Sequence, residues 1–329
     1  MIDPARALAP DPAALVVAVA LDLVVGDPVY RAHPVRLIGR TLQWFERRLR
    51  PAGLDGYGGG ILLFILLTML WLPVLAGLIV LAQAISTSTA WLVHVLLVYS
   101  LLALGDLLHH VWRIESAVRR DNIDEARQAV SALVGRDTDR MDGPACRRAG
   151  VESLSENLTD GFVSPVFWYV LGGLPGIVLF KIVSTMDSMV GYKTPEYLRF
   201  GWCGARLDDA MNYLPARLTW FLIVCVAAVA PGLSGRKGWR VGLGQHAVLL
   251  GPNSGWSEAA MAGALARRIV GPIWLKGVLV TDLWVGDPND PPLSTNSDVM
   301  KAMALTLTTG LLAVALAAAA LTTFGSALA

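Results

Sequence analysis

The stretch GILLFILLTMLWLPVLAGLIVLA, from Gly60 to Ala82, has 23 residues and none of them is charged. About 20 apolar residues are enough for a helix to span the hydrocarbon core of a bilayer. The whole chain has the same character, since 54% of its 329 residues are hydrophobic and only 16% are charged. Soluble domains carry about 25% charged residues. The sequence therefore predicts an all-α, polytopic integral membrane protein with a single membrane-embedded domain over residues 1–329.

Further helices are predicted on both sides of this span. Residues 91–108 and 303–324 are again apolar and long enough to cross a membrane. The apolar segment 13–25 is short for a full span, and we expect a tilted or partial membrane helix there. Segment 218–230 is also short, and the sequence assigns no path to it. Amphipathic helices are predicted on the cytoplasmic side, first from Pro34 to Arg50 and again, as soluble helices, within 113–149.

The apolar segment from Phe162 to Ile182 is interrupted at its centre by the run GGLPG, Gly172 to Gly176. Glycine and proline weaken or break a helix, and a broken helix inside a bilayer is tolerated where it lines a polar cavity. We therefore expect two half-helices here, which enter the membrane and return to the side from which they came.

Positive charges are unevenly distributed along the chain. The link 83–89 and the tail after Lys301 carry none of the 27 Lys and Arg residues. The positive-inside rule therefore places this link and the C-terminus outside an inner or plasma membrane, and the charged segments in the cytoplasm. Those charged segments, with 6, 8, 4 and 7 Lys and Arg residues, are 26–59, 113–161, 186–217 and 232–302.

Composition also excludes two classes of function. The net charge of +1 gives no case for nucleic-acid binding. The cysteines at positions 146, 203 and 225 are widely spaced and form no CxxC pair, so the sequence suggests neither a disulfide framework nor a zinc site.

The run ESLSENLTDGFVSP, Glu152 to Pro165, should be helical as far as Gly161, and it concentrates negative charge. Glu152, Glu156 and Asp160 follow one another at intervals of four residues, so they would stack on one face of the helix. Like charges at that spacing repel one another, which favours a cation beside them. This cation could be a metal ion such as Mg²⁺ or a set of arginine side chains.

A second polar run extends from Lys181 to Thr219, between two apolar segments. Ionisable groups at a membrane border are costly to desolvate and are functional candidates by default. The alternative is a solvated loop between helices with ordinary ion pairs. The ionisable candidates in this run are Lys181, Asp187, Lys193, Arg199, Arg206, Asp208, Asp209 and Arg217.

The run PNSGWSEAAMAGAL, Pro252 to Leu265, joins a turn to a helix of small residues. Ser257 could cap a helix that begins at Glu258. An amide-rich turn that opens a helix is suited to an anion such as phosphate. Plain helix capping explains the same residues, so both interpretations stay open.

These blocks together resemble the adenosylcobinamide-phosphate synthase family (CobD/CbiB), membrane enzymes of cobalamin synthesis. The resemblance extends over about residues 21–266 in the family's order. Ser184 and Ser257 depart from it, where the family usually has Asn and Pro. The blocks that carry the resemblance are GDP and HPVRLIGR near the N-terminus, VGRDT (Val134–Thr138), Glu156-Asn157 with Asp160-Gly161, DSMVGY (Asp187–Tyr192), FGWCGARLDD (Phe200–Asp209), PARLT (Pro215–Thr219) and PNSGWSEAAMAGAL.

The resemblance implies an ATP-dependent amide ligase. Such an enzyme joins the free propionate of adenosylcobyric acid to (R)-1-amino-2-propanol or its O-phosphate. ATP and Mg²⁺ are the implied cofactors, since the carboxylate must be activated, plausibly as an acyl phosphate. No Walker A loop is present, so no known motif identifies the nucleotide site. The resemblance leaves open a homo-oligomer and an association with other membrane enzymes of the pathway.

Roles for individual residues follow from the resemblance together with the chemistry of each side chain. Carboxylates are suitable ligands for Mg²⁺, lysine and arginine bind phosphate and carboxylate, and aromatic rings could cover a corrin face. We expect catalytic roles for Lys181, Asp187, Arg206, Asp208 and Asp209, and metal binding by Glu152, Glu156 and Asp160. We expect substrate or nucleotide contacts from Asp27, His33, Arg36, Arg136, Asn157, Tyr192, Lys193, Trp202, Asn212, Arg217, Asn253, Ser254, Gly255, Trp256 and Glu258.

Two other classes of function remain as alternatives. A membrane transporter also uses broken helices with charges near the bilayer midplane, but the sequence has no paired halves with matching breaks. A non-catalytic membrane regulator of similar architecture would have no reason to hold so many carboxylates together with Lys and Arg.

Overall fold

The computed structural model describes residues 7–26, 30, 32–249 and 251–328. Contacts within the chain gather into two compact units, and each is built from segments far apart in sequence. The first unit comprises Met1–Ala103, Ser164–Asn212 and Val314–Ala329, and the second comprises Leu104–Val163 and Tyr213–Ala313. Each unit is described by itself below.

Helices dominate the structure, as the sequence predicts. Helical segments of the described chain that are long and apolar enough to cross a membrane number five. The expectation of an all-α polytopic membrane protein is therefore confirmed. The five segments are Tyr57–Ile85, Thr87–Arg119, Gly143–Val190, Trp202–Val229 and Asn296–Thr323.

The first unit contains the apolar helix that decides the fold. This helix, α4 (Tyr57–Ile85), is longer than predicted at both ends. Its buried residues include Leu63, Leu67 and Trp71, which follow one another at intervals of four residues and form a seam along one side. Trp71 donates a hydrogen bond from Nε1 to Thr41 Oγ1 at 2.9 Å, which ties α4 to the amphipathic helix α3 (Pro34–Leu49). Met69, on the other side of α4, is 70% exposed, as expected of a lipid-facing residue.

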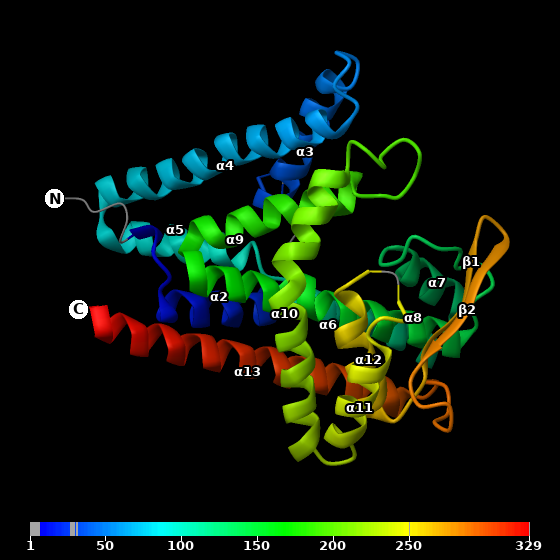
Figure 1. Ribbon diagram of the computed structural model, residues 1–329. Coiled ribbons are helices and arrows are strands. Elements are labelled where there is room, and N and C mark those ends of the chain that lie inside the picture. The colour runs from blue at the N-terminus through cyan, green and yellow to red at the C-terminus, as the bar shows by residue number, and fades with distance from the viewer. Residues whose placement is uncertain (1–6, 27–29, 31, 250, 329) are drawn as a thin grey trace. The chain divides into compact units, whose positions relative to one another are not determined.

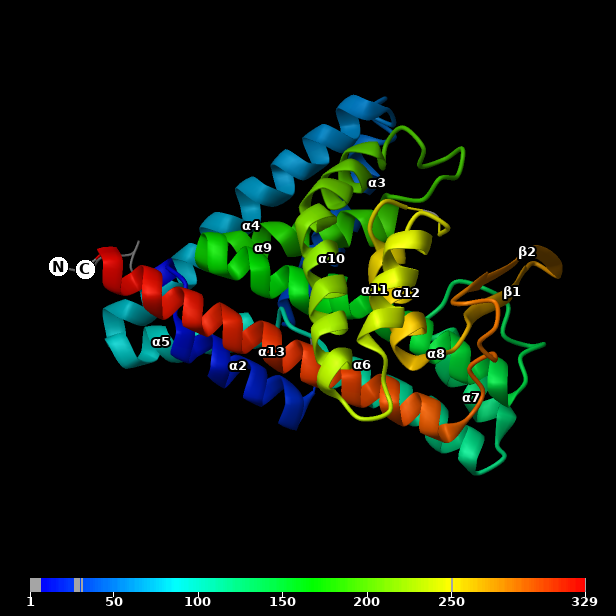
Figure 2. The same cartoon turned by 60° about the horizontal axis from the view of Figure 1, so that its bottom comes forward.

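The predicted break in the apolar segment after Phe162 is confirmed. Helix α9 (Ser164–Val190) has non-helical backbone angles at Gly173, with φ of 59° and ψ of −148°. Only glycine adopts such angles freely, and a Cβ atom there would lie 2.2 Å from the carbonyl oxygen of Leu8. The two halves of α9 then run back alongside each other (Figures 1 and 2). A Cβ atom on Gly176 would lie 2.2 Å from Trp168 O, so the reversal is tight.

One predicted helix is divided in the structure, and one segment that the sequence left unassigned becomes part of a longer helix. Residues 91–108 were expected to form one helix. In the structure α5 (Thr87–Tyr99) ends within this segment, and α6 (Leu104–Arg119) begins after a turn. At this turn the Ser100 hydroxyl donates to the carbonyl oxygen of Leu96, and such local bonds compete with the regular helix. The segment 218–230 is not a separate element either. It is the apolar end of α10 (Trp202–Val229), which hydropathy alone divides at the change from polar to apolar residues.

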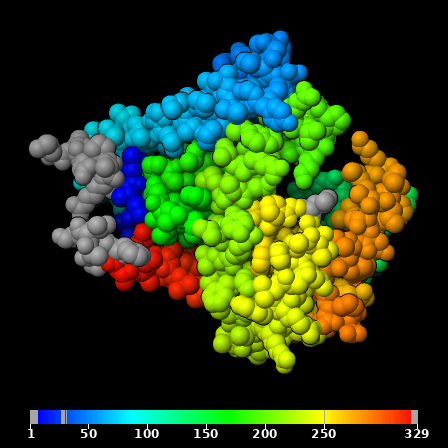
Figure 3. Space-filling model, in the orientation of Figure 1, coloured from blue at the N-terminus to red at the C-terminus, as the bar shows by residue number. Residues whose placement is uncertain are grey.

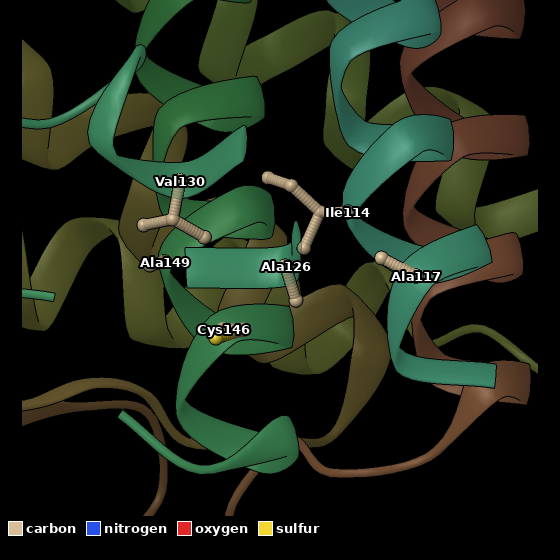
Figure 4. Close-up of a cluster of buried hydrophobic side chains, with 6 residues drawn as sticks. All are labelled: Ile114, Ala117, Ala126, Val130, Cys146 and Ala149. Atoms are coloured by element: carbon tan, nitrogen blue, oxygen red, sulfur yellow. The ribbon is translucent and has the colours of Figure 1, made fainter. Parts of the chain in front are cut away.

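The second unit is built on three short helices, α6, α7 (Ile123–Ser131) and α8 (Gly143–Asn157). Asn122 caps the start of α7 by accepting a hydrogen bond from the amide of Glu125. Small and branched side chains from the three helices meet in a core that Figure 4 shows. The members of this core are Ile114, Ala117, Ala126, Val130, Cys146 and Ala149.

Helix α12 (Ser254–Leu265) is buried along its length in the second unit, and it packs beside α11 (Gly235–Gln245) in both views (Figures 1 and 2). Close approach is possible because α12 is rich in small residues. A Cβ atom on Gly263 would lie 2.5 Å from Lys237 O of α11. The predicted start of this helix at Glu258, capped by Ser257, is wrong. Asn253 occupies the N-cap position, and the Ser257 hydroxyl donates to the carbonyl oxygen of Ser254.

The sequence did not predict the β-hairpin of the second unit. Strands β1 (Ile269–Leu275) and β2 (Val278–Val285) pair antiparallel around Lys276 and Gly277, which both have positive φ, as a tight hairpin turn requires. Asp137 holds this turn, since its carboxylate accepts from the amide of Gly277 at 2.7 Å. The last predicted span is confirmed as α13 (Asn296–Leu328), which begins in the second unit and ends in the first.

Candidate functional site

An open pocket in the first unit lies between the start of α10 and the loop that precedes it. This loop, Gly191 to Gly201, follows α9 and is largely exposed (Figures 1 and 3). The pocket has a volume of about 150 Å³. Five predicted site residues line it: Tyr192, Lys193, Trp202, Arg206 and Asp209. The other lining residues, which the sequence did not single out, are Gly191, Tyr197, Leu198 and Ala205.

Predicted catalytic carboxylates gather beside this pocket. Asp187 lies in the last turn of α9, and a Cβ atom on Gly191 would lie 2.1 Å from its Oδ1, so only glycine leaves room there. Asp208 and Asp209 lie in the polar first half of α10. Asp208 is within electrostatic range of both Asp187 and Asp209, and of the ammonium group of Lys181. Arg206 Nη1 in turn lies 3.6 Å from Asp209 Oδ2, so the structure brings all five predicted catalytic groups together.

A short hydrogen-bond chain orients the carboxylate of Asp208. Asn212 donates from Nδ2 to Asp208 Oδ2 at 2.9 Å. The Ser164 hydroxyl in turn donates to Asn212 Oδ1 at 2.5 Å, which fixes which end of the amide faces the carboxylate. Asn212 is buried and Ser164 is fully buried, so this chain is shielded from solvent. The sequence predicted Asn212 as a contact residue but gave no signal for Ser164.

The three carboxylates Glu152, Glu156 and Asp160, here called the acidic ladder, lie in the second unit and have an arginine partner. Arg136 Nη2 donates to Glu152 Oε2 at 2.6 Å, and both side chains are mostly buried. Helix α8 does not end at Gly161 as predicted. It passes into a π-helical segment, η1 (Leu158–Val163), which carries Asp160.

The ladder does not form a preformed metal cage. Across residues 7–26, 30, 32–249 and 251–328, no group of three or more His, Cys, Asp or Glu side chains is placed to hold a metal ion. The geometry of Glu152 instead follows the second interpretation left open by the sequence, pairing with an arginine. Dependence of the protein on Mg²⁺ stays a prediction. Mg²⁺ is in any case usually bound through one or two carboxylates together with substrate phosphates.

Glu258 projects from the buried helix α12 toward the acidic ladder. Its side chain is only 4% exposed, and the charges that act on it are those of Glu152, Glu156, Asp160 and Arg136. Burial raises the pKa of Glu258 well above its ordinary value, and the three carboxylates raise it further, against the opposing effect of Arg136. The structure thus joins Glu258, which the sequence grouped with the substrate contacts, to the residues predicted to bind metal.

The raised pKa of Glu258 predicts how stability depends on pH. A carboxyl group with a higher pKa in the folded state stabilises the fold below its unfolded-state pKa, and this contribution is lost as the pH rises toward the folded-state pKa. The loss is about 1.4 kcal/mol for each pH unit within that window. We expect Glu258→Gln, which imitates the protonated form, to lose less stability than the wild type between pH 5 and 9.

Thermal unfolding of the detergent-solubilised protein across this pH range would check the prediction. Glu125→Gln is a suitable control, because Glu125 is an exposed residue of α7 in the same unit. Parallel pH profiles for the wild type and Glu258→Gln would show that Glu258 does not titrate in this way.

Arg217 is stacked between two aromatic rings near the start of α12. Its guanidinium lies 3.5 Å from the ring centroid of Tyr213 and 4.9 Å from that of Trp256. Its Nη1 also donates to Asn253 Oδ1 at 3.4 Å. Predicted contacts Arg217, Asn253 and Trp256 are therefore neighbours, and the backbones of Ser254 and Gly255 form the first turn of the same helix. Phosphate binding there stays a prediction.

The remaining predicted contacts are less informative. Asp27 lies outside the described residues. His33 is buried at the N-cap position of α3, with its ring edge-on to Tyr30, and Arg36 lies on the exposed side of that helix. Asn157 donates within its own helix, to Ser153 O at 2.9 Å.

Comparisons with known proteins agree with the resemblance seen in the sequence. The family model described as CobD/Cbib protein matches residues 15–306. A protein of a Sinorhizobium species, named cobalamin biosynthesis protein CobD, is 38% identical over 295 residues, covering 87% of this chain and 90% of its own length. A Photorhabdus laumondii protein of the same name is 39% identical and covers 84% of this chain and 87% of its own length.

A third relative carries the other name of the family. The cobalamin biosynthesis protein CbiB of Salmonella typhimurium is 38% identical over 278 residues, covering 82% of this chain and 86% of its own length. No solved structure matches the chain. The relatives therefore support the family assignment, and the geometry described above has no solved counterpart among the comparisons.

Proposed function

We propose a specific activity for this chain, which belongs to the CobD/CbiB family of membrane proteins in cobalamin biosynthesis. The activity is ATP-dependent amide ligation. It joins the free propionate of adenosylcobyric acid to the amino group of (R)-1-amino-2-propanol or of its O-phosphate. The product is adenosylcobinamide or adenosylcobinamide phosphate.

The observation that carries this proposal is the pocket of the first unit with its adjoining charges. Lys193 and Arg206 line the pocket and suit the phosphates of a nucleotide or of a phosphorylated amine. Tyr192 and Trp202 offer aromatic faces to a planar ligand, and both are exposed. Lys181 lies near Asp208, in the group of carboxylates beside the pocket. A pocket with cations, aromatic faces and carboxylates suits a reaction between a phosphorylated donor and an amine.

The chemistry requires two transfers. The propionate oxygen attacks the γ-phosphorus of ATP, giving an acyl phosphate and ADP. The amine nitrogen then attacks the acyl carbon, the C–O bond to phosphate breaks, and inorganic phosphate leaves. The amine loses two protons overall, one to become nucleophilic and one as the amide forms. We propose that Lys181, Lys193 and Arg206 stabilise the negative charge that develops on the phosphoryl and acyl oxygens during the two transfers. We propose that Asp208 binds the ammonium form of the amine and accepts its proton.

Magnesium enters this proposal as part of the substrate MgATP. The described residues provide no protein cage of three or more ligands, whereas one or two carboxylates together with phosphate oxygens are sufficient for Mg²⁺. Asp187 and Asp209 are the two carboxylates beside the pocket that we assign to this contact.

Reconstitution with defined substrates tests the proposal. Purified protein is incubated with adenosylcobyric acid, ATP, Mg²⁺ and aminopropanol phosphate, and the corrinoids are followed by mass spectrometry. We expect the mass of adenosylcobinamide phosphate and a matching amount of ADP. Omission of ATP or of the amine should abolish the product. ATP consumption without any amide product would contradict the proposed ligation.

The same proposal places the pocket on the cytoplasmic side of the cell membrane, where ATP is available. Single cysteines at Ser86, Thr194 and Lys276, all exposed in the structure, would report the side of the membrane in a cysteine-free background. We expect a membrane-impermeant maleimide added to intact cells to label position 86 only. External labelling at position 194 would contradict the cytoplasmic placement of the pocket.

A further inference from the structure

Arg50, which directly follows α3, binds the loop that forms one wall of the pocket. Its Nη1 donates to Glu196 Oε1 at 2.9 Å and to Glu46 Oε1 at 3.1 Å. Its Nη2 reaches the backbone carbonyl oxygen of Glu196 at 3.4 Å. The guanidinium is therefore held by α3 on one side and grips both the side chain and the backbone of the loop on the other.

Aromatic residues of the same loop pack around this guanidinium. The ring centroid of Tyr197 lies 5.0 Å from Arg50 Cζ, and that of Phe200 lies 5.7 Å away. Glu46 also acts on the Tyr197 hydroxyl, whose pKa is raised by burial and by the nearby carboxylate of Glu46. Tyr197 and its neighbour Leu198 line the pocket, so the contacts of Arg50 lie immediately behind the pocket wall.

The two ends of the loop are fixed by close packing, whereas its middle is exposed. At one end Gly191 lies against the carboxylate of Asp187. At the other end Phe200 is fully buried, and a Cβ atom on Gly60 would lie 2.0 Å from its carbonyl oxygen. Between these ends Tyr192 is 57% exposed and Leu198 is 57% exposed. The contacts with Arg50 hold the middle of the loop to a helix.

We propose that Arg50 is a positioning residue for this pocket. By holding Glu196 and Tyr197 it fixes the wall that carries Tyr192 and Lys193 opposite α10. This inference rests on the proposed function in one respect, namely that the pocket takes a substrate of the ligation. Arginine suits the task because its planar fork donates in several directions at once, which the ammonium group of lysine does not.

Substitution of Arg50 tests the proposal, and the same helix provides a matched control. We expect Arg50→Gln and Arg50→Lys to raise the KM for a substrate of the pocket about fivefold to tenfold, the size expected for the loss of a partly exposed ion-pair network, with little change in kcat. Arg48→Gln removes the same charge two residues earlier. It should change neither value, because Arg48 stacks on Trp44 and lies on the exposed side of α3.

Limited proteolysis gives a second readout that does not depend on activity. Trypsin can cleave after Lys193 and after Arg199, both of which are exposed in the loop. We expect Arg50→Gln to speed cleavage at these positions about fivefold relative to Arg48→Gln, with unchanged cleavage elsewhere. Glu196→Gln is a second variant in case Arg50→Gln folds poorly. It should fold normally, because the Glu196 side chain is 61% exposed and the substitution leaves the contact between Arg50 and Glu46 in place.

The outcomes separate this inference from the proposed ligase function. Unchanged cleavage in both Arg50→Gln and Glu196→Gln would overturn the proposal, because the loop would not depend on Arg50. Faster cleavage with an unchanged KM would also overturn it, since the held wall would not position a substrate. Absence of ligation by the wild type would contradict the function alone. In that case, trypsin cleavage in the presence of MgATP would still test the inference. If MgATP protects the loop in the wild type but not in Arg50→Gln, the inference is supported. If MgATP protects the loop in both proteins, the inference is overturned.

Discussion

Asp208→Asn is expected to lower kcat for amide formation by about 10²- to 10⁴-fold, the range associated with removal of a general base. Asn212 and Ser164 orient the carboxylate of Asp208, and Lys181 lies within electrostatic range. Asparagine has nearly the same shape and can still accept the hydrogen bond from Asn212. The substitution therefore removes the negative charge that we assign to binding and deprotonating the amine, and it leaves packing intact.

The measurement should separate chemistry from folding. Membrane insertion and the elution profile in detergent are expected to match those of the wild type, while single-turnover assays show the fall in rate. Asp55→Asn is the control, because Asp55 is an exposed carboxylate in the loop before α4 of the same unit. Turnover within a factor of about three of the wild type would mean that Asp208 has a structural role, since the loss of a general base costs far more.

Prediction of the fold succeeded where the physical signal lies within a short window of sequence. The uncharged run from Gly60 to Ala82 is long and apolar enough to span a bilayer, so the sequence alone predicted α4. The Gly172–Gly176 run identified the reversal in α9 because positive φ and close backbone approach both require glycine. In each case the cause is local, and a single sequence contains it.

Prediction failed where distant segments decide the outcome. Hydropathy separated the polar residues 202–217 from the apolar residues that follow, yet α10 is a single helix that continues past Pro215. Proline cannot donate to the carbonyl oxygen of Met211, which accepts a hydrogen bond from Trp168 Nε1 instead. The β-hairpin has no strong alternation in sequence, and part of its support comes from Asp137, more than 130 positions earlier. Pairings of this kind depend on tertiary contacts that no local pattern records.

In the candidate site, too, local spacing was predictable from the sequence and contacts between distant segments were not. Spacing alone placed Glu152, Glu156 and Asp160 on one helix, but it could not foresee the π-helical segment between Leu158 and Val163. Nor could it foresee that Arg136 would bind Glu152, because that contact joins a turn to a helix. Tyr197 was overlooked although it lies among predicted residues in the loop. Its neighbours Glu196 and Arg199 are charged, and an aromatic residue between charged side chains is the signal that could have identified it.

Glu115→Gln is expected to destabilise the second unit by about 3–5 kcal/mol, the cost of breaking a buried ion pair by removing one partner. Glu115 is fully buried. Arg147 donates to it from Nε at 2.6 Å and from Nη2 at 2.8 Å, and Asn296 donates to it from Nδ2 at 2.8 Å. The same guanidinium donates from Nη1 to Ser294 O at 2.9 Å. One carboxylate thus links α6, α8 and the start of α13.

The neutral amide of glutamine would leave the mostly buried charge of Arg147, whose side chain is 15% exposed, without its counter-ion. A loss of this size is a large fraction of the stability of a typical domain, which is about 5–15 kcal/mol. We therefore expect a sharp fall in the thermal midpoint and in the yield of folded protein, measured by fluorescence-detected size-exclusion chromatography after heating. Glu125→Gln removes a carboxylate from the exposed pair with Arg120 in the same unit, and it should cost no more than about 1 kcal/mol. Equal thermal midpoints for Glu115→Gln and Glu125→Gln would show that Glu115 and Arg147 are not the link between these helices. In the exchanged pair, Glu115→Arg with Arg147→Glu, partial recovery of the thermal midpoint would attribute the loss to the ion pair itself.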